Sequence, residues 1–260
     1  ISEAVTRWAR DYGFDGTRLD CIGWGQAPNW GTPLRANASM AKGGLELNKV
    51  VRDSMRAANP DAVTLPEGGK PLVFRNADLL FDYPLYLAMR DMTATPDLPL
   101  WIRRVREWLQ FERHCYPRRA LPGLVRFLEN HDTVCPAQLF GVGPSQALMA
   151  ICSLIQGTPL LYQEQEIGFS EDLSRWLKLR NTEKCFYDGS ADYLATKCSD
   201  PEVFSFLRLC DEGAAAGICS LACIPSPAVD RNRRVRPRAS TRLTRHRPDR
   251  RSDAHPSGKP

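Results

Sequence analysis

The chain has 260 residues, enough for one large domain or for a domain with a smaller companion. Its hydrophobic content of 43% and charged content of 25% are ordinary for a globular protein and exclude a chain that is disordered throughout. The net charge of +5 comes from one segment, because residues 228–260 hold eleven Lys or Arg against three Asp, which leaves −3 for residues 1–227. The basic character therefore belongs to the C-terminal segment.

Strands and helices alternate along the first 180 residues. Apolar residues that recur every three to four positions predict helices over 2–11, 45–58, 100–113, 145–155 and 171–180. Short apolar or alternating runs predict a strand that ends at Asp20 and further strands over 62–67, 78–83, 124–130 and 160–162. Strands that alternate with helices and are joined by short turns indicate parallel βαβ units.

No window reaches the roughly 18 uninterrupted apolar residues that a membrane span needs, and no signal peptide is visible. We therefore predict a cytoplasmic protein without a membrane partner, although the chain starts at Ile1 and its N-terminus is expected to be incomplete. Nine scattered cysteines lack the spacing of a metal site and are expected to be free thiols in a reducing compartment. Four histidines argue against a zinc site.

Polar side chains fall at the C-terminal ends of the predicted strands. Asp20 and Glu67 end two strands, and His131-Asp132 follow a third. In a (β/α) barrel these ends converge on one rim, where such barrels place catalytic groups. Arg18 shares a strand face with Asp20 and keeps its carboxylate ionised. Taken singly, each residue also has a structural reading, as an ion pair, a cap or a hydrogen-bonded core histidine.

Four segments resemble motifs of the α-amylase family of glycoside hydrolases (glycoside hydrolase family 13). Residues 13–20 resemble its fourth-strand motif, 65–67 its fifth, 127–132 its seventh and 157–168 its eighth. The resemblance covers about residues 1–208 and implies an α/β fold, a (β/α)8 TIM barrel with strands 4–8 present and its N-terminal part missing. The family's third-strand motif, an Asp and an Asn-His pair, is absent.

The resemblance also assigns roles. Asp20 would be the nucleophile, Glu67 the general acid/base and Asp132 the stabiliser of the oxocarbenium-like transition state, with Arg18 and His131 as substrate-binding residues. Retention requires the nucleophilic and acid/base carboxyl groups to lie about 5–5.5 Å apart. We therefore expect a retaining glycosidase of the α-amylase or α-glucosidase type that cleaves α-glucosidic bonds in oligo- or polysaccharides.

Several alternatives stay open. A transglycosylase or isomerase, such as a trehalose synthase or glucanotransferase, would share the same catalytic set. A non-catalytic glucosidase-like barrel would be expected to lose the carboxylates that are present here. The visible motifs require no cofactor and no metal, and they leave calcium dependence, oligomeric state and the activity of this fragment open. An α-glucan or oligosaccharide is the expected partner, and nucleic acid is not.

The C-terminal third differs in pattern from the rest. Residues 192–208 alternate as strands do and resemble the start of the small β-domain that follows the barrel in this family. From about Ile218 the pattern gives way to Cys, Pro, Arg and Ser, a composition typical of disorder. We therefore predict barrel residues over 1–182, a truncated β-domain over 183–217 and a disordered basic tail over 218–260. A nucleic-acid-binding tail is the remaining alternative, and no interleaved aromatic residues favour it.

Overall fold

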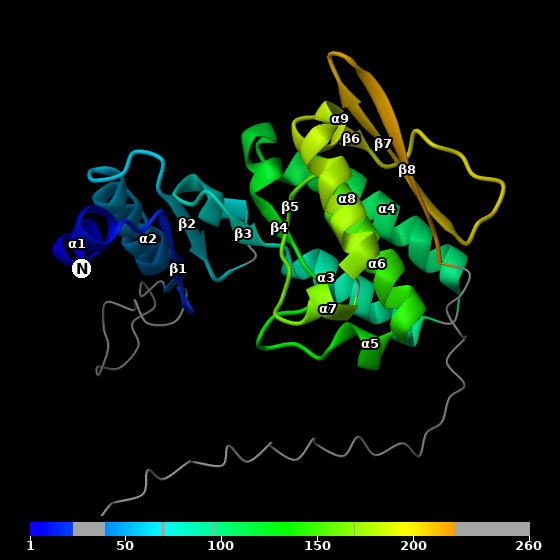
Figure 1. Cartoon of the computed structure of the whole chain (residues 1–260), viewed down its shortest axis with the longest axis horizontal. Coiled ribbons are helices and arrows are strands. Elements are labelled where there is room, and N and C mark those ends of the chain that lie inside the picture. The colour runs from blue at the N-terminus through cyan, green and yellow to red at the C-terminus, as the bar shows by residue number, and fades with distance from the viewer. Residues whose placement is uncertain (23–39, 69–70, 96, 169, 222–260) are drawn as a thin grey trace, which may run out of the picture. The chain divides into compact units, whose positions relative to one another are not determined.

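The computed structural model describes residues 1–22, 40–68, 71–95, 97–168 and 170–221 (Figure 1). Contacts within the chain separate Ile1–Pro227 from Ala228–Pro260. The tail predicted over 218–260 falls outside the described residues from position 222 onward.

Five short parallel strands follow one another in space in their chain order. They are β1 (Gly16–Leu19), β2 (Val63–Pro66), β3 (Leu80–Phe81), β4 (Leu124–Arg126) and β5 (Thr158–Pro159). β1 pairs with β2, and β3, β4 and β5 form a second parallel ladder. The Leu79 amide donates to the Thr64 carbonyl at 3.0 Å, which joins β2 to the segment that leads into β3. The pattern is that of a partial α/β barrel, because all five C-terminal strand ends point the same way.

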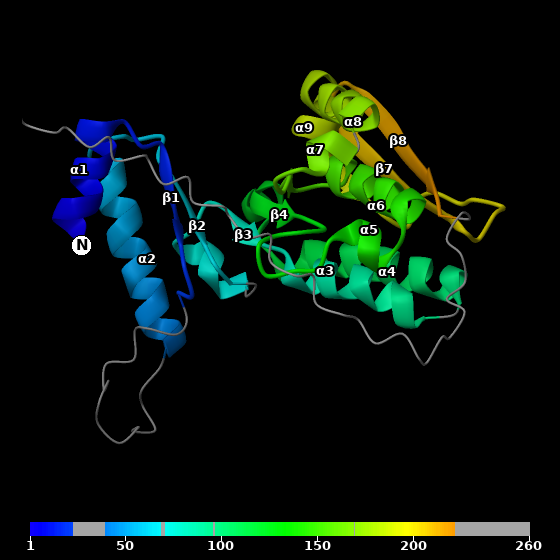
Figure 2. The ribbon, with the colours of Figure 1, turned by 60° about the horizontal axis from the view of Figure 1, so that its bottom comes forward.

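Helices precede, connect and follow these strands along the chain (Figure 1). They are α1 (Ser2–Tyr12), α2 (Met40–Arg56), α3 (Tyr83–Arg90), α4 (Leu98–Cys115), α5 (Pro136–Leu139), α6 (Val142–Leu154), α7 (Gln165–Gly168), α8 (Ser170–Thr182) and α9 (Lys184–Tyr187), with 3-10 turns over Pro71–Arg75, Asp91–Ala94 and Arg118–Gly123. Figure 2 shows α1 and α2 side by side next to β1 and β2. Their shared core is formed by Val5, Ala9, Val51, Met55 and Ala62.

A three-stranded antiparallel sheet ends the described chain. It consists of β6 (Ser190–Asp192), β7 (Val203–Cys210) and β8 (Gly213–Ser220). Its Phe204 and Phe206 belong to the largest hydrophobic core, together with Leu109 of α4 and Leu148 of α6. The sheet therefore shares a core with the helices, while the boundaries that we predict for a separate β-domain stay a prediction.

A buried charged network fixes the start of α3. Arg126 at the end of β4 is only 1% exposed, and it pairs with Asp82 and with Glu112 of α4 at 2.7 Å. Asp82 also caps α3, because its Oδ1 accepts from the Leu85 amide at 3.1 Å. The guanidinium of Arg126 thus holds the carboxylate that sets where α3 begins.

The predicted helices are confirmed, with ends that differ by at most five residues. The strands are shorter than predicted. β4 stops at Arg126 instead of position 130, and the strand predicted over 160–162 is found at Thr158–Pro159. The strand predicted over 78–83 is wrong at its end, because Tyr83 begins α3. Pro84 lies in the first turn of that helix. β8 continues to Ser220, three residues past the predicted position 217.

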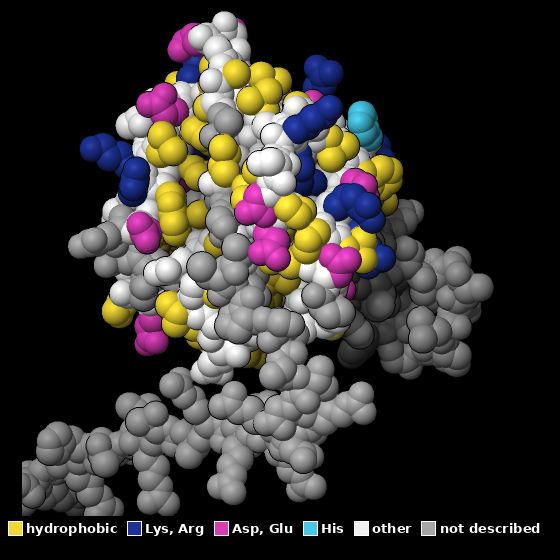
Figure 3. Space-filling model, turned by 90° about the vertical axis from the view of Figure 1, so that its right-hand side faces the viewer, with side chains coloured by type: hydrophobic (Ala, Val, Ile, Leu, Met, Phe, Trp, Pro, Cys, Tyr) yellow, Lys and Arg dark blue, Asp and Glu magenta, His cyan; other side chains and the backbone are white. Residues whose placement is uncertain are grey.

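None of the described helices combines the length and the apolar character needed to cross a lipid bilayer. On the face shown in Figure 3, hydrophobic side chains lie between acidic and basic ones, and charges of both signs occur. This face therefore does not present the single-sign basic surface that is typical of a nucleic-acid interface.

Candidate active site

The first two predicted carboxylates follow neighbouring parallel strands at matching positions. In the β1–β2 register Leu19 lies opposite Pro66, so Asp20 and Glu67 are the next residues of each strand. The Glu67 amide donates to the Leu19 carbonyl at 2.8 Å, which continues the ladder up to the carboxylate. β1 approaches β2 closely at Gly16, where a Cβ would lie 2.5 Å from the Val63 carbonyl oxygen. Two rigid strand ends therefore deliver the two carboxylates.

One guanidinium joins these carboxylates. Arg18 pairs with Asp20, and its Nη2 lies 3.0 Å from Oε2 of Glu67. An oxygen of Asp20 and an oxygen of Glu67 lie within 4.8 Å of each other. The Asp20 side chain is 73% exposed and that of Glu67 is 18% exposed. The pair therefore consists of one open carboxylate and one that is half enclosed.

Cys21 lies in the same cluster. Its backbone amide donates to Oε2 of Glu67 at 2.8 Å, and its thiol lies within 4.8 Å of both carboxylates. Cys21 has a φ of 41°, which a residue other than glycine seldom adopts. This turn of the backbone directs the amide toward Glu67.

The third predicted carboxylate lies in a turn after β4. Asn130 organises this turn, since its Oδ1 accepts from the Asp132 amide at 3.0 Å and its own amide donates to Thr133 Oγ1 at 2.8 Å. His131 Nε2 lies 3.3 Å from Oδ2 of Asp132, and both side chains are exposed. The turn thus presents an imidazole and a carboxylate as neighbours.

Tyr83 connects the turn to the first two carboxylates. Its hydroxyl accepts a hydrogen bond from Asn130 Nδ2 at 3.3 Å. Burial raises the pKa of the Tyr83 phenol, and the negative charges of Glu67 and Asp132 act in the same direction. The ring packs edge to face against Phe127, with centroids 5.3 Å apart. The Tyr83 hydroxyl is therefore protonated, and it lies close enough to Glu67 and to Asp132 to be affected by the charges of both.

These contacts determine the ionisation state of Asp20. The hydrogen bond from Arg18 holds the pKa of Asp20 below its ordinary value, and the charge of His131 adds to this effect. Asp20 is therefore an ionised, exposed carboxylate at neutral pH, which is the state that a nucleophile requires.

Asp20, Cys21 and Glu67 also form a set of metal-ligand types, with their ligand atoms within 4.8 Å of one another. The guanidinium of Arg18 already pairs with both carboxylates of this set. A cation at the same place would have to compete with the guanidinium, so the donor set fits an ion poorly.

The structure places the predicted residues in two groups. Arg18 lies in direct contact with Asp20 and Glu67, and His131 and Asp132 form a second pair. His131 acts electrostatically on Asp20, and Asp132 acts on Tyr83. The sequence prediction missed Cys21 and Tyr83. Tyr83 could have been found, since it lies two positions after the end of β3, close to the C-terminal strand ends where the other site residues lie.

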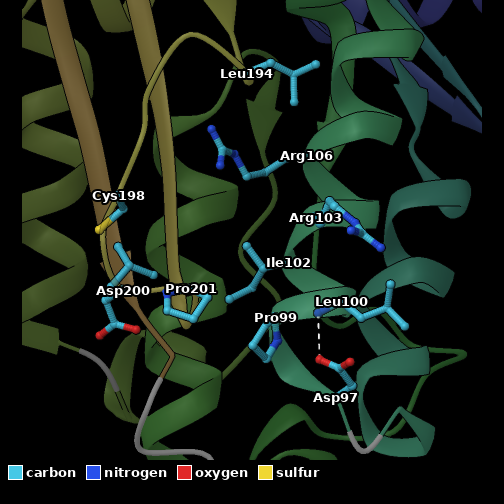
Figure 4. Close-up of a pocket in the computed structure, with 11 residues that line it drawn as sticks. Asp97, Pro99, Leu100, Ile102, Arg103, Arg106, Leu194, Cys198, Asp200 and Pro201 are labelled. Carbon is cyan, nitrogen blue, oxygen red and sulfur yellow. Dashed lines mark hydrogen bonds between the residues drawn. The ribbon is translucent and has the colours of Figure 1, made fainter.

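A separate pocket of about 510 Å³ lies between α4 and the connection from β6 to β7 (Figure 4). It contains none of the predicted site residues. Its polar groups serve local structure, because Asp97 caps α4 by accepting from the Leu100 amide at 2.9 Å and Arg106 donates to the Tyr193 and Thr196 carbonyls. We interpret this pocket as a surface hollow and not as part of the site.

No protein-family model matches the sequence, and no curated protein matches it. The solved structures that resemble this chain are α-amylase-family enzymes. A maltogenic α-amylase from Thermotoga neapolitana is similar with a TM-score of 0.65 and 20% identity, over 84% of this chain and 52% of that chain. A cyclic α-maltosyl-(1→6)-maltose hydrolase from Arthrobacter globiformis is similar with a TM-score of 0.67 and 16% identity, over 84% of this chain and 51% of that chain.

A cyclomaltodextrinase is also similar, with a TM-score of 0.62 and 20% identity, over 83% of this chain and 38% of that chain. The Arthrobacter hydrolase has been solved in complex with maltose. This chain spans about half of the length of the first and second of these enzymes. At these identities the likeness establishes the fold, which is part of the α/β barrel that these enzymes contain.

Proposed function

We propose that this chain belongs to the α-amylase family and carries the catalytic groups of a retaining glycosidase that acts on α-glucosidic bonds. The observation that carries the proposal is the separation of Asp20 and Glu67, whose nearest described oxygens lie within 4.8 Å. Retaining glycosidases need about 5–5.5 Å between the two carboxyl groups, whereas inverting enzymes leave about 6.5–9.5 Å for a water molecule. The short separation supports retention.

In the proposed reaction Asp20 attacks the anomeric carbon, and the bond from that carbon to the leaving oxygen breaks. Glu67 gives its proton to the leaving oxygen and then, as a carboxylate, takes a proton from water. That water attacks the anomeric carbon, and the bond from this carbon to Asp20 breaks. Arg18 keeps Asp20 ionised for the first step. The amide of Cys21 holds the Glu67 carboxylate in place for the second step.

Asp132 and His131 are proposed to bind the hydroxyl groups of the sugar. A carboxylate accepts hydrogen bonds from hydroxyl groups, and its charge stabilises a developing oxocarbenium ion. The turn built by Asn130 supports this role, because the Asn130 side chain accepts a hydrogen bond from the backbone amide of Asp132 and so holds that residue in place. The Tyr83 hydroxyl is a further group that could donate to the sugar. No metal or cofactor enters the proposed reaction.

The proposed substrates are short α-glucans. The similar solved enzymes are named as a maltogenic α-amylase, a cyclomaltodextrinase and a cyclic maltosyl-maltose hydrolase, and the last is solved with maltose bound. These names support the substrate class of the family.

A trapping experiment tests the proposal on the chain itself. A 5-fluoro-α-glucosyl fluoride should form an ester with Asp20 as fluoride leaves, and mass spectrometry of the digested protein should find the fluoroglucosyl group on that residue. Because fluoride leaves without protonation, Glu67→Gln should still be labelled. Asp20→Asn should not be labelled.

Asp15→Asn provides the matched control, since Asp15 lies at the opposite end of β1 and bonds only Asn59 among its described side-chain contacts. It should be labelled like the unchanged chain. A label on any other residue, or labelling of Asp20→Asn at the normal rate, contradicts the assignment of the nucleophile. A non-catalytic barrel would leave all variants unlabelled.

A further inference from the structure

Two cysteine side chains meet between α9 and the β7–β8 hairpin. Sγ of Cys185 lies 2.8 Å from Sγ of Cys210, and both residues are half-buried free thiols. Cys185 lies in the first turn of α9, and Cys210 is the last residue of β7, paired with Gly213 across the hairpin. The sulfur of Cys185 also lies 3.5 Å from the Gly213 carbonyl oxygen. The two thiols are therefore in direct contact although 25 positions separate them.

Contacts on both sides of the thiol pair hold the two backbones together. On one side, Lys184 Nζ lies 2.8 Å from Asp211 and 2.9 Å from Glu212, which form the hairpin turn. On the other side, the buried Arg208 of β7 donates to the carbonyl of Phe186 at 2.9 Å and to that of Gly189 at 2.7 Å.

Gly189 permits this approach. A Cβ at that position would lie 2.1 Å from the Cys185 carbonyl oxygen and 2.7 Å from that of Leu209, so only glycine allows the end of α9 to come this close to β7. The neighbouring residues thus fix the positions of the two cysteines, and a covalent bond between their sulfurs needs little backbone movement.

We propose that Cys185 and Cys210 form a dithiol that reacts with low-molecular-weight disulfides and closes to a disulfide bond between α9 and β7. One thiolate attacks a sulfur of the small disulfide, gives a mixed disulfide and releases one small thiol. The second thiolate then attacks the protein sulfur and releases the other small thiol. The protein loses two protons and two electrons, and the small disulfide is reduced to two thiols.

The bond would close a loop that contains β6 and most of β7. Closing a loop of this length restricts the unfolded chain and stabilises the folded one. Because the flanking contacts already exist, oxidation would lock an arrangement that the reduced chain adopts. The inference does not depend on the proposed glycosidase activity.

The test treats the full chain with oxidised glutathione at about pH 8.5, because the hydrogen bond to Cys210 raises the pKa of the Cys185 thiol. We expect a disulfide-linked pair of peptides about 2 Da lighter than the two thiol peptides together, and an apparent melting temperature higher by roughly 5–10 °C, both reversed by a reductant. Cleavage by trypsin and by a glutamate-specific protease should yield one cross-linked pair. Cleavage after Glu212 separates Cys210 from Cys219, so the pair identifies the bond.

Cys185→Ser should abolish the cross-linked pair and the rise in melting temperature. Cys198→Ser is the control, since Cys198 is exposed and lies on the connection between β6 and β7, and it should react like the unchanged chain. Stable glutathione adducts at Cys185 or Cys210 would overturn the proposal. So would a cross-link from Cys210 to another cysteine.

Discussion

The two carboxylates that contact Arg18 have different surroundings. Arg18 contacts both Asp20 and Glu67, yet Asp20 projects into solvent, whereas Glu67 is partly enclosed and bonded by the Cys21 amide. Carboxylates in different environments can take different roles in one reaction. The open, ionised Asp20 is suited to attack, and the held Glu67 is suited to exchange protons with the leaving group and with water.

Removing the charge of Arg18 tests this division of roles. In Arg18→Gln the pKa of Asp20 should rise toward its ordinary value, because the hydrogen bond from Arg18 is the main cause of its lowering. The acidic limb of the pH profile of kcat/KM should therefore move to higher pH, and the plateau should fall about 100-fold. Arg10→Gln, which loses a similar bond to Asp11 on α1, is the control and should leave the profile unchanged. An unshifted acidic limb in Arg18→Gln would contradict the role of the ion pair.

The buried network behind the site provides a second prediction. Burial raises the pKa of Glu112 to about 7, and the negative charge of Asp82 adds to this effect while Arg126 opposes it. The folded chain therefore binds more protons than the unfolded chain between about pH 4.5 and 7, so this group's contribution to stability falls as pH rises through that window. Urea unfolding midpoints measured across the window should fall more steeply for the unchanged chain than for Glu112→Gln.

Glu107→Gln on the same helix is the control, because Glu107 is exposed. Its midpoints should follow those of the unchanged chain at every pH. Parallel curves for the unchanged chain and Glu112→Gln would show that Glu112 is not the group that titrates.

The site residues on β1 and β2 could be predicted because charge and position coincide in the sequence. An arginine two positions before an aspartate at a strand end is visible without a structure, and it forms the expected ion pair. The hydrogen bond from the Cys21 amide to Glu67 could not be predicted. It depends on a backbone group and on a positive φ, and a cysteine side chain indicates neither.

At the scale of elements, the sheet is built from strands of two to four residues. β3 and β5 each pair with β4 over only two positions. The length of such strands is set by pairing with neighbouring strands and not by a long alternating run. The predicted positions of β4 and β5 are therefore nearly right, while their predicted ends are wrong. The helices bury a repeating apolar face over many turns, and their periodicity predicted them well.

Close packing around Arg126 makes one glycine indispensable. Gly157 has a φ of 140°, and a Cβ there would lie 2.5 Å from Arg126 Nε and 2.6 Å from the Leu124 carbonyl oxygen. Gly157→Ala should therefore lower the free energy of unfolding by more than about 2 kcal/mol. Gly143→Ala in α6 has nothing within 4 Å of the added Cβ and should be neutral or stabilising by up to about 1 kcal/mol. Equal midpoints for the two variants in urea would contradict the packing argument.

At the scale of the whole molecule, the excess of basic residues and the candidate site lie in different parts of the chain. Residues 1–227 carry a net charge of −3 and contain all of the candidate site, whereas residues 228–260 carry +8. A glycosidase that binds uncharged sugars has no need of the basic segment. A nucleic-acid-binding protein would depend on it, because contacts to phosphates supply most of non-specific affinity.

Ending the chain at Pro227 distinguishes these two functions. The shortened chain should lose its salt-sensitive retention on a polyanionic resin, since its net charge becomes −3. Its melting temperature should stay within about 1 °C, because the described cores lie within residues 1–221. Asp20 should react with the fluoroglucosyl fluoride at the unchanged rate, since every described contact of that residue lies within the retained part. Loss of labelling on truncation would mean that the basic segment supports the site, and the separation of charge from catalysis would then be wrong.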